Sequence, residues 1–360
     1  HAFAGDGKPE LTRAVARDAG PDGVSAGNIR DARFGDAQRE APRRGRRRRR
    51  QSERIGRMSA GDPRTDGFES NFSNNGLHGV AIETLGNVTI KNMRASDNSS
   101  DGVYIDNRYD GSGFGSVRVL ASSDWMNDFS YNQGSGLAIS SNGNVLLTNL
   151  YAEGNKEHGV AIYNGYPEKS GYVRVTSAGK YGSNNFFNNQ FSGLYILSNG
   201  SITLSKVTAA NNEQRGAYLD NSHSPAAPAI SITQGEFWDN GLDGLYVRSK
   251  GNITWKLGGA SGNGHHGAYL HNNDGTGSVT VSGSGQARMQ FHDNGWEGTG
   301  FNGMEIVSNG QITLGYADAS NNNGHGFYIS NKDSAINQKV VVTEASMNRN
   351  YYSGLFILSA

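Results

Sequence analysis

The chain has no cysteine among its 360 residues. This absence excludes a disulfide framework and any metal site built from thiolates. Only 35% of the residues are hydrophobic, whereas 51 are glycine. A compact α/β enzyme buries parallel strands that read as continuous apolar runs, so the composition argues against that class. It favours a thin, elongated repeat fold in which each short strand buries only a few side chains.

Long apolar segments are also missing. No run approaches the roughly 20 residues that a membrane-spanning helix needs, so we expect no membrane span. No signal peptide is visible, although the chain begins at His1 rather than Met. A cysteine-free sequence rich in Asn, Gly and Ser fits an exported protein. We therefore expect an extracellular or bacterial cell-surface location.

The formal net charge of zero hides two unequal parts. Residues 1–66 hold 16 Lys and Arg against 10 Asp and Glu, including the run from Arg46 to Arg50. This segment has few apolar residues and is predicted to be disordered. It can be interpreted as a solvated linker, as a mistranslated upstream region, or as an arm for an acidic surface. We expect no nucleic-acid partner and place the folded domain at residues 67–360.

A four-residue signature, glycine followed by apolar-x-apolar, recurs along that domain. Successive glycines are 23, 34, 23, 34, 23, 28, 23, 36, 23 and 28 residues apart, so short and long units alternate. The signature glycines are Gly79, Gly102, Gly136, Gly159, Gly193, Gly216, Gly244, Gly267, Gly303, Gly326 and Gly354. Such a fixed period is the mark of a solenoid.

Other landmarks keep the same register. Asn stands four residues before the signature glycine in ten of eleven units, the exception being Thr299. Short units carry a second glycine seven residues after the first, and long units carry Asn five residues after it. Strands of three to five residues between Gly and Asn corners cannot be helices. Gly and Asn tolerate left-handed backbone at such bends.

These features predict an all-β solenoid of about eleven coils with 23-residue and 28–36-residue turns. Equivalent strands would stack in parallel roughly 4.8 Å apart, with buried Asn side chains bonded from coil to coil. The coil length, the Asn corners and the Gly-apolar-Tyr-Ile strands resemble the right-handed parallel β-helix superfamily that includes pectin lyases. That superfamily contains polysaccharide lyases, glycoside hydrolases, phage tailspikes and non-catalytic surface proteins. The resemblance therefore implies an architecture rather than an activity.

The second residue after each signature glycine is expected to face outward, because the first and third are apolar. In four consecutive units this residue is tyrosine, and a fifth tyrosine follows later: Tyr195, Tyr218, Tyr246, Tyr269 and Tyr328. Aromatic ladders stabilise stacked strands by themselves. Sugars also stack on such rings, so the ladder is equally a candidate platform for an extended polysaccharide.

Polar residues beside this ladder are weak catalytic candidates. Asp220, Arg248 and His271 occupy the fourth position in three successive units, and Glu305 occupies the second position in the next. A lyase needs a base for the proton beside a uronate carboxylate and a cation to neutralise that carboxylate. The plain alternative is a surface ion pair between Asp220 and Arg248. We find no acidic cluster for calcium and expect neither a metal nor a cofactor.

Gly324-His325-Gly326 resembles a motif of polygalacturonases, but their Asp-Asp pair and Arg-x-Lys strand are missing. His also precedes the signature glycine at His78, His158 and His266, several coils apart. Metal ligands must lie near 2 Å from one ion, so these histidines cannot share a metal. We interpret this histidine as a variable turn residue.

Loops are predicted at one corner of the long units, such as Arg108–Ser116, Gly165–Gly171 and Ser222–Ala229, with a further loop at Ser282–Thr299. Insertions on one edge of a solenoid commonly mark its binding face. The last coil stops six residues after Gly354. We therefore expect a fragment of a longer repeat protein that can self-associate through open coil ends.

The leading hypothesis is a non-catalytic, adhesin-like stalk that either binds a polysaccharide or serves as a spacer for display. The alternative is a carbohydrate-active enzyme, either a lyase or a hydrolase.

Overall fold

The computed structural model describes residues 14–15, 24–25, 70–108, 114–122, 125–165, 171–179, 182–334 and 338–359. The basic segment 1–66 lies outside these ranges, except for the two-residue strands β1 (Ala14–Val15) and β2 (Val24–Ser25). Its expected disorder therefore stays a prediction. No helix long and apolar enough to cross a membrane occurs in the part of the chain that the structure describes.

The strands form two parallel sheets of 12 and 17 strands. The first sheet contains β1, β4 (Val80–Glu83), β7 (Val103–Asp106), β10 (Leu137–Ser141), β13 (Val160–Asn164), β16 (Leu194–Ser198), β18 (Ala217–Asp220), β20 (Leu245–Arg248), β22 (Ala268–Asn272), β25 (Met304–Ser308), β27 (Phe327–Ser330) and β29 (Leu355–Leu358). The second contains β2, β3 (Ser70–Asn71), β5 (Val88–Lys91), β6 (Met93–Arg94), β8 (Val117–Leu120), β9 (Asn127–Asp128), β11 (Val145–Thr148), β12 (Leu150–Glu153), β14 (Val173–Thr176), β15 (Asn184–Phe187), β17 (Ile202–Ala210), β19 (Ile230–Trp238), β21 (Ile253–Ser261), β23 (Val279–Ser282), β24 (Met289–His292), β26 (Ile312–Ser320) and β28 (Val340–Asn348).

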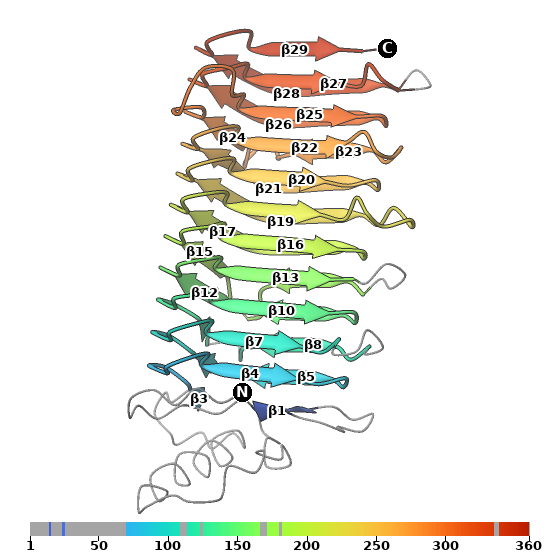
Figure 1. Ribbon diagram of the computed structural model, residues 1–360. Helices are drawn as coiled ribbons and strands as arrows, with labels where there is room; N and C mark the ends of the chain where they lie inside the picture. The colour runs from blue at the N-terminus through green and yellow to red at the C-terminus, as the bar shows by residue number, and fades with distance from the viewer. Residues whose placement is uncertain are drawn as a thin grey trace, which may run out of the picture.

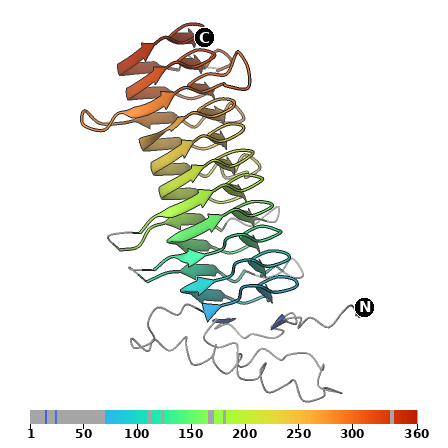
Figure 2. The same cartoon turned by 90° about the vertical axis from the view of Figure 1, so that its left-hand side faces the viewer.

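Each coil contributes one strand to the first sheet and two strand segments, separate or merged, to the second. Equivalent strands pair in register from coil to coil, as where β16 pairs with β18 through Leu194 and Ala217. Figure 1 shows the coils stacked from β4 to β29, and Figure 2 shows the same stack turned by 90°. The protein is a right-handed parallel β-helix with alternating short and long coils, as the repeat predicts.

The core lies between the sheets and consists of the residues that alternate inward. In β7, Val103 and Ile105 are fully buried while Tyr104 is partly exposed. The second sheet adds larger side chains, and Trp255 packs edge-on between Phe237 and Phe291 at ring-centroid distances of 5.7 and 5.4 Å. Period-two alternation therefore identifies the buried columns correctly.

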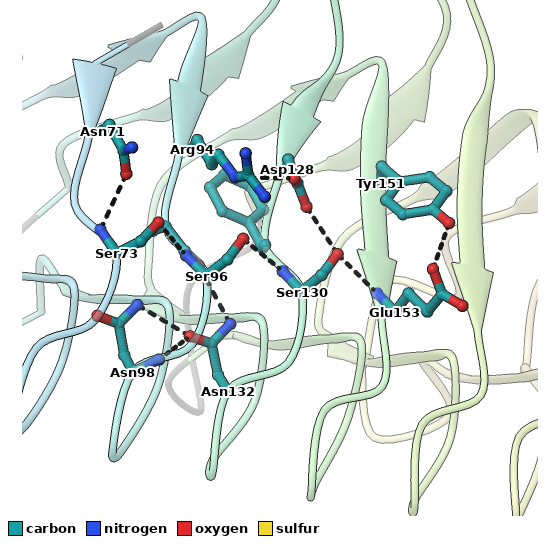
Figure 3. A network of polar contacts seen from close by, with 12 residues as sticks. Asn71, Ser73, Arg94, Ser96, Asn98, Asp128, Ser130, Asn132, Tyr151 and Glu153 are labelled. Atoms are coloured by element: carbon teal, nitrogen blue, oxygen red, sulfur yellow. Dashed lines mark hydrogen bonds and ion pairs between the residues drawn. The ribbon is translucent and has the colours of Figure 1, made fainter.

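A buried asparagine ladder runs along the corner before the first sheet. Asn98 donates from its backbone N and its Nδ2 to Oδ1 of Asn132, at 3.1 and 2.9 Å. Asn132 in turn donates to Asn155, and its Nδ2 also reaches the carbonyl oxygen of Ala95 at 3.1 Å. Figure 3 shows this ladder beside a second row in which Ser96 N donates to Ser73 Oγ at 3.0 Å. Every amide group of the ladder interior is thus satisfied without water.

The ladder continues through the unit that departs from the pattern. Asn294, not Thr299, accepts from Asn263 Nδ2 at 3.0 Å and donates to Asn322 at 2.9 Å. Residues 295–302 therefore form a corner of eight residues between the ladder asparagine and Gly303, which is an insertion of five residues relative to the three of the other corners. The predicted loop Ser282–Thr299 is wrong as a single loop, because it contains β24 and this ladder residue.

The signature glycines serve close packing rather than left-handed backbone. A Cβ on Gly193 would stand 2.8 Å from Asn212 Nδ2 and 2.9 Å from the carbonyl oxygen of Gly216. Positive φ occurs instead at the residue before each ladder asparagine, such as Asn188 (φ 55°) and Asp239 (φ 55°). Mostly Asn, Asp or Gly fill that place, which fits their tolerance of this conformation.

The corner after the first sheet explains the alternation of coil length. In long coils an Asn such as Asn272 donates to the carbonyl oxygen of Gly251 below it at 2.8 Å. In short coils a hydroxyl takes that place, and Ser308 Oγ donates to Asn272 Oδ1 at 2.7 Å. A Cβ on Gly251 would stand 2.2 Å from the carbonyl oxygen of Ala227. Each loop of a long coil therefore lies against a glycine corner of a short one.

Candidate ligand-binding face

The outer surface of the first sheet between β16 and β25 carries three columns of side chains. The central column holds the tyrosines, the second column holds the residues just before the signature glycines, and the third holds the fourth strand position. We call this surface the tyrosine face. Its members are Ser192, Tyr195, Leu197, Arg215, Tyr218, Asp220, Asp243, Tyr246, Arg248, His266, Tyr269, His271, Asn302, Glu305 and Val307.

The four tyrosine rings form one continuous stack. Tyr195 and Tyr218 have centroids 4.9 Å apart with planes 11° apart, and the next two pairs are both 5.1 Å apart, at 5° and 12°. Nearly parallel rings at this spacing are offset from one another, which is the favoured aromatic geometry. All four tyrosines are partly exposed, so part of each side chain remains accessible to solvent.

Both ends of the stack are defined. Before Tyr195, the preceding coil has Ala161 at the same strand position, and His158 and Tyr163 of that coil contact the Tyr195 ring at centroid distances of 4.8 and 5.8 Å. Beyond Tyr269 the position is Glu305, whose register partner is Tyr269. Tyr328 lies one coil further and stacks on Phe356 at 5.5 Å, so it does not belong to the four-ring stack.

The phenol groups are neutral hydrogen-bonding groups. Burial and the Asp220 carboxylate raise the pKa of Tyr218 to about 12, and burial and Glu305 raise that of Tyr269 to about 12. Tyr218 donates to Asp220 Oδ2 at 3.3 Å. The hydroxyls of Tyr195, Tyr246 and Tyr269 have no hydrogen-bond partner among the described residues, which leaves them available to a ligand.

The column before the glycines contains a partly buried ion pair. Arg215 Nε lies 3.0 Å from Asp243 Oδ2. The same guanidinium lies 5.0 Å from the Tyr246 ring centroid and 5.7 Å from that of Tyr218. Arg215 thus combines a carboxylate contact with a cation–π contact to the stack.

Asp220 differs from its expected role. Its side chain is only 3% exposed, and its Oδ1 accepts hydrogen bonds from Ser222 N and Oγ at 2.8 and 2.7 Å. The expected ion pair with Arg248 does not form within the described residues, although the two are register partners. Arg248 Nη2 instead lies 2.8 Å from Asp274 Oδ2, on the loop that follows β22.

His271 is the register partner of Arg248 and is partly exposed. Burial, and then the neighbouring Arg248 charge, lower the pKa of His271. Its ring meets that of Tyr269 edge-on, with centroids 5.5 Å apart. Arg248 and His271 are therefore adjacent, as expected from sequence. The Asp220 carboxylate instead accepts hydrogen bonds from Ser222 in the turn that follows β18.

Glu305 closes the stack at the insertion. Asn302 Nδ2 donates to Glu305 Oε2 at 2.8 Å, and burial raises the pKa of this carboxyl. His266 Nδ1 lies 3.8 Å from the same oxygen but accepts the backbone N–H of Asn302 at 3.0 Å. An acceptor nitrogen carries no proton, and burial lowers the pKa of His266 to about 4, so this contact is not an ion pair.

The residues before the signature glycines share a structural role that sequence reasoning missed. Six side chains in this column accept the backbone N–H of the equivalent residue in the next coil: Asp101, His158, Asp243, His266, Asn302 and His325. Examples are Asp101 to Ser135 at 2.7 Å, His158 to Ser192 at 3.2 Å and Asn302 to His325 at 2.7 Å. Asp, Asn and His all offer an acceptor at this reach, which explains the variation. His158, His266 and His325 are turn residues that also accept a backbone N–H, whereas His78 Nδ1 lies 3.2 Å from Asp101 Oδ2.

Comparison with known proteins finds no matching protein-family model and no matching curated protein. Two solved structures are similar: the A-modules of the mannuronan C-5 epimerases AlgE6 and AlgE4 from Azotobacter vinelandii. Identities are 14% and 13%, each with a TM-score of 0.41; 80% of this chain and 83% or 88% of theirs are covered. A likeness of this size carries nothing about chemistry, and the strand pairings establish the fold by themselves.

Proposed function

We propose that the protein is a non-catalytic, extracellular β-helix module that binds a polysaccharide along the tyrosine face. The observation that carries this proposal is the continuous four-ring stack with three hydroxyls lacking partners among the described residues. A row of phenols repeats once per coil, and a polysaccharide repeats in the same way along its chain. Loops such as Ser222–Ala229 follow the strands of this face and line its edge.

The first experiment measures retention of the protein on a panel of plant, algal and bacterial polysaccharides by affinity electrophoresis. We expect retention that is lost when Tyr218, Tyr246 and Tyr269 are all replaced by Ala. Because each aromatic pair contributes about 0.5–1.5 kcal/mol to stability, the triple variant also loses stability. Tyr246→Phe with Tyr269→Phe keeps the stack and removes two hydroxyls, and should weaken binding roughly fivefold for each hydrogen bond lost.

Tyr328→Ala is the matched control, because Tyr328 has the same strand position outside the stack. It should leave retention unchanged. Equal retention of wild type and both multiple variants would overturn the proposal, as would loss of binding in the control alone.

A second candidate, a polysaccharide lyase or hydrolase, is favoured by one observation. His271 stands beside Arg248, and its lowered pKa keeps the ring unprotonated at neutral pH, as a general base requires. Incubation with uronate polymers should then release unsaturated products, and His271→Ala should abolish the release. Products from wild type would replace the non-catalytic proposal with this one.

A further inference from the structure

The charges around the tyrosine stack are arranged in pairs. Arg215 lies 3.0 Å from Asp243, and Arg248 lies 2.8 Å from Asp274. These are the two arginines of the face, and each guanidinium already has a carboxylate partner. A charged ligand group that approached either arginine would therefore also approach its carboxylate partner, which offsets the attraction.

Two carboxylates remain after this pairing. Neither Asp220 nor Glu305 has a lysine or arginine within 4.0 Å among the described residues. Asp220 accepts from Ser222 and Tyr218, and Glu305 accepts from Asn302. His266 and His271 do not compensate, because burial lowers the pKa of both. The histidine closest to Asp220 is His223, whose Nδ1 lies 3.9 Å from Asp220 Oδ1 on a side chain that is 80% exposed. The carboxylates of the face, Asp220, Asp243 and Glu305, thus outnumber its two arginines.

From this balance we infer that the tyrosine face selects an uncharged glycan chain over a carboxylated or sulfated one. The inference rests on the proposed function. Neutral phenol hydroxyls can form hydrogen bonds with sugar hydroxyls without bringing like charges together. An anionic chain on the same face would lie close to the Glu305 carboxylate and above the buried Asp220 carboxylate, and both would repel it. Like-charge juxtaposition suppresses wrong partners in this way.

Asp243→Asn is the variant that tests the masking of Arg215. Asp243 Oδ1 accepts the backbone N–H of His266 at 3.2 Å, and an amide oxygen keeps that bond. Asn302 occupies the same position two coils further and accepts His325 N at 2.7 Å, so asparagine fits this place in the chain. The substitution therefore removes one negative charge and leaves Arg215 unpaired without disturbing the corner.

The matched control is Asp101→Asn. Asp101 holds the same position in an early coil and accepts Ser135 N at 2.7 Å, but it lies outside the tyrosine face. Both variants change the net charge of the protein by the same amount. Any difference between them therefore reports on the local pairing of Arg215.

Binding is measured for the full chain with neutral glucan, mannan and xylan and with polygalacturonate and alginate, at low and high salt. Wild type should retain neutral polymers independently of salt and retain the anionic ones at least about tenfold less well. Asp243→Asn should gain about tenfold for the anionic polymers at low salt only, and Asp101→Asn should gain nothing.

Preferential, salt-sensitive retention of the anionic polymers by wild type would overturn the selectivity while leaving polysaccharide binding intact. An Asp243→Asn variant that behaves like Asp101→Asn would show that Arg215 is not masked. Failure to retain any polymer would instead remove the proposed function itself, and the selectivity with it.

Discussion

Single side chains at the corners of this fold perform two tasks at once. On the tyrosine face, Asp243, His266 and Asn302 each accept a backbone N–H of the next coil and also border the tyrosine column. His266 shows the consequence for ionisation, because its Nδ1 is committed to Asn302 N at 3.0 Å. Protonation of this ring would break the bond and place a charge in a buried site. The acceptor role therefore makes the stability of the protein depend on pH.

Replacement of His266 by Asn should weaken that dependence. The native pKa is about 4 against an ordinary value of 6.5, so between these values the unfolded state binds the proton and the native state does not. Stability contributed by neutral His266 is thus present above pH 6.5 and is lost as the pH falls toward 4. His266→Asn should reduce the loss of unfolding free energy between pH 7 and pH 4 by about 3 kcal/mol.

Urea unfolding at a series of pH values measures this effect. The control is His223→Asn, since the side chain of His223 is 80% exposed. A pH profile for His266→Asn that runs parallel to the wild-type profile would contradict the assignment of a buried neutral histidine.

At the scale of one element, the clearest departure from the repeat is the corner of residues 295–302, which contains the five-residue insertion. It carries Trp296, which is 59% exposed, and Phe301, which stacks on His265 at a centroid distance of 4.1 Å. The Asn ladder and the strand β25 on either side keep their register. The coil therefore accommodates the insertion outside its hydrogen-bonded frame.

Removal of Trp296–Gly300 should restore an ordinary corner. The resulting Asn294-Gly295-Phe301-Asn302-Gly303 matches Asn263-Gly264-His265-His266-Gly267 in length and in its Asn and Gly positions. Because shortening a surface loop changes closure entropy only slightly, the unfolding free energy should stay within about 1 kcal/mol of wild type. Thermal unfolding of the deletion variant measures this. A variant that is unfolded, or that has a much lower unfolding temperature than wild type, would show instead that the insertion stabilises the coil.

This element also marks the limit of prediction from sequence. The buried columns and the order of the tyrosines follow from local alternation and a constant register, so the coils and the stack could be predicted. The Asn-to-Gly spacing assumes a corner of constant length, and it therefore left an exception at Thr299 where Asn294 continues the ladder. The pairing of Arg248 with Asp274 depends on the path of a loop without periodicity. Such contacts require coordinates.

The whole molecule is built from coil pairs rather than single coils. Long coils present Asn at the corner after the first sheet, and short coils present Gly and a hydroxyl, as where Asn272 meets Gly251 and Ser308. A Cβ on Gly277 would stand 2.3 Å from the carbonyl carbon of Gly251, so loop and glycine corner are in close contact. Solenoid stability is a sum of coil terms and neighbour terms, and here the favourable neighbour is always of the other kind.

Deleting one coil should therefore destabilise the protein more than deleting two coils. Removing residues 217–267 joins Gly216 to Ala268 and keeps a long coil between two short ones. Removing only residues 245–267 joins Gly244 to Ala268 and brings the long coils of Asn221 and Asn272 together. Without the Gly251 corner, Asn272 Nδ2 loses an acceptor and two loops compete for one place.

The larger deletion should unfold cooperatively in urea, with unchanged circular dichroism per residue and a smaller m-value, because less surface is exposed. The smaller deletion should be less stable than the larger by roughly 2 kcal/mol or more, the cost of buried groups left unsatisfied. A one-coil deletion that is the more stable of the two would show that coils add independently of their kind. The alternation of coil length would then reflect only where loops are inserted, and packing between neighbouring coils would not require it.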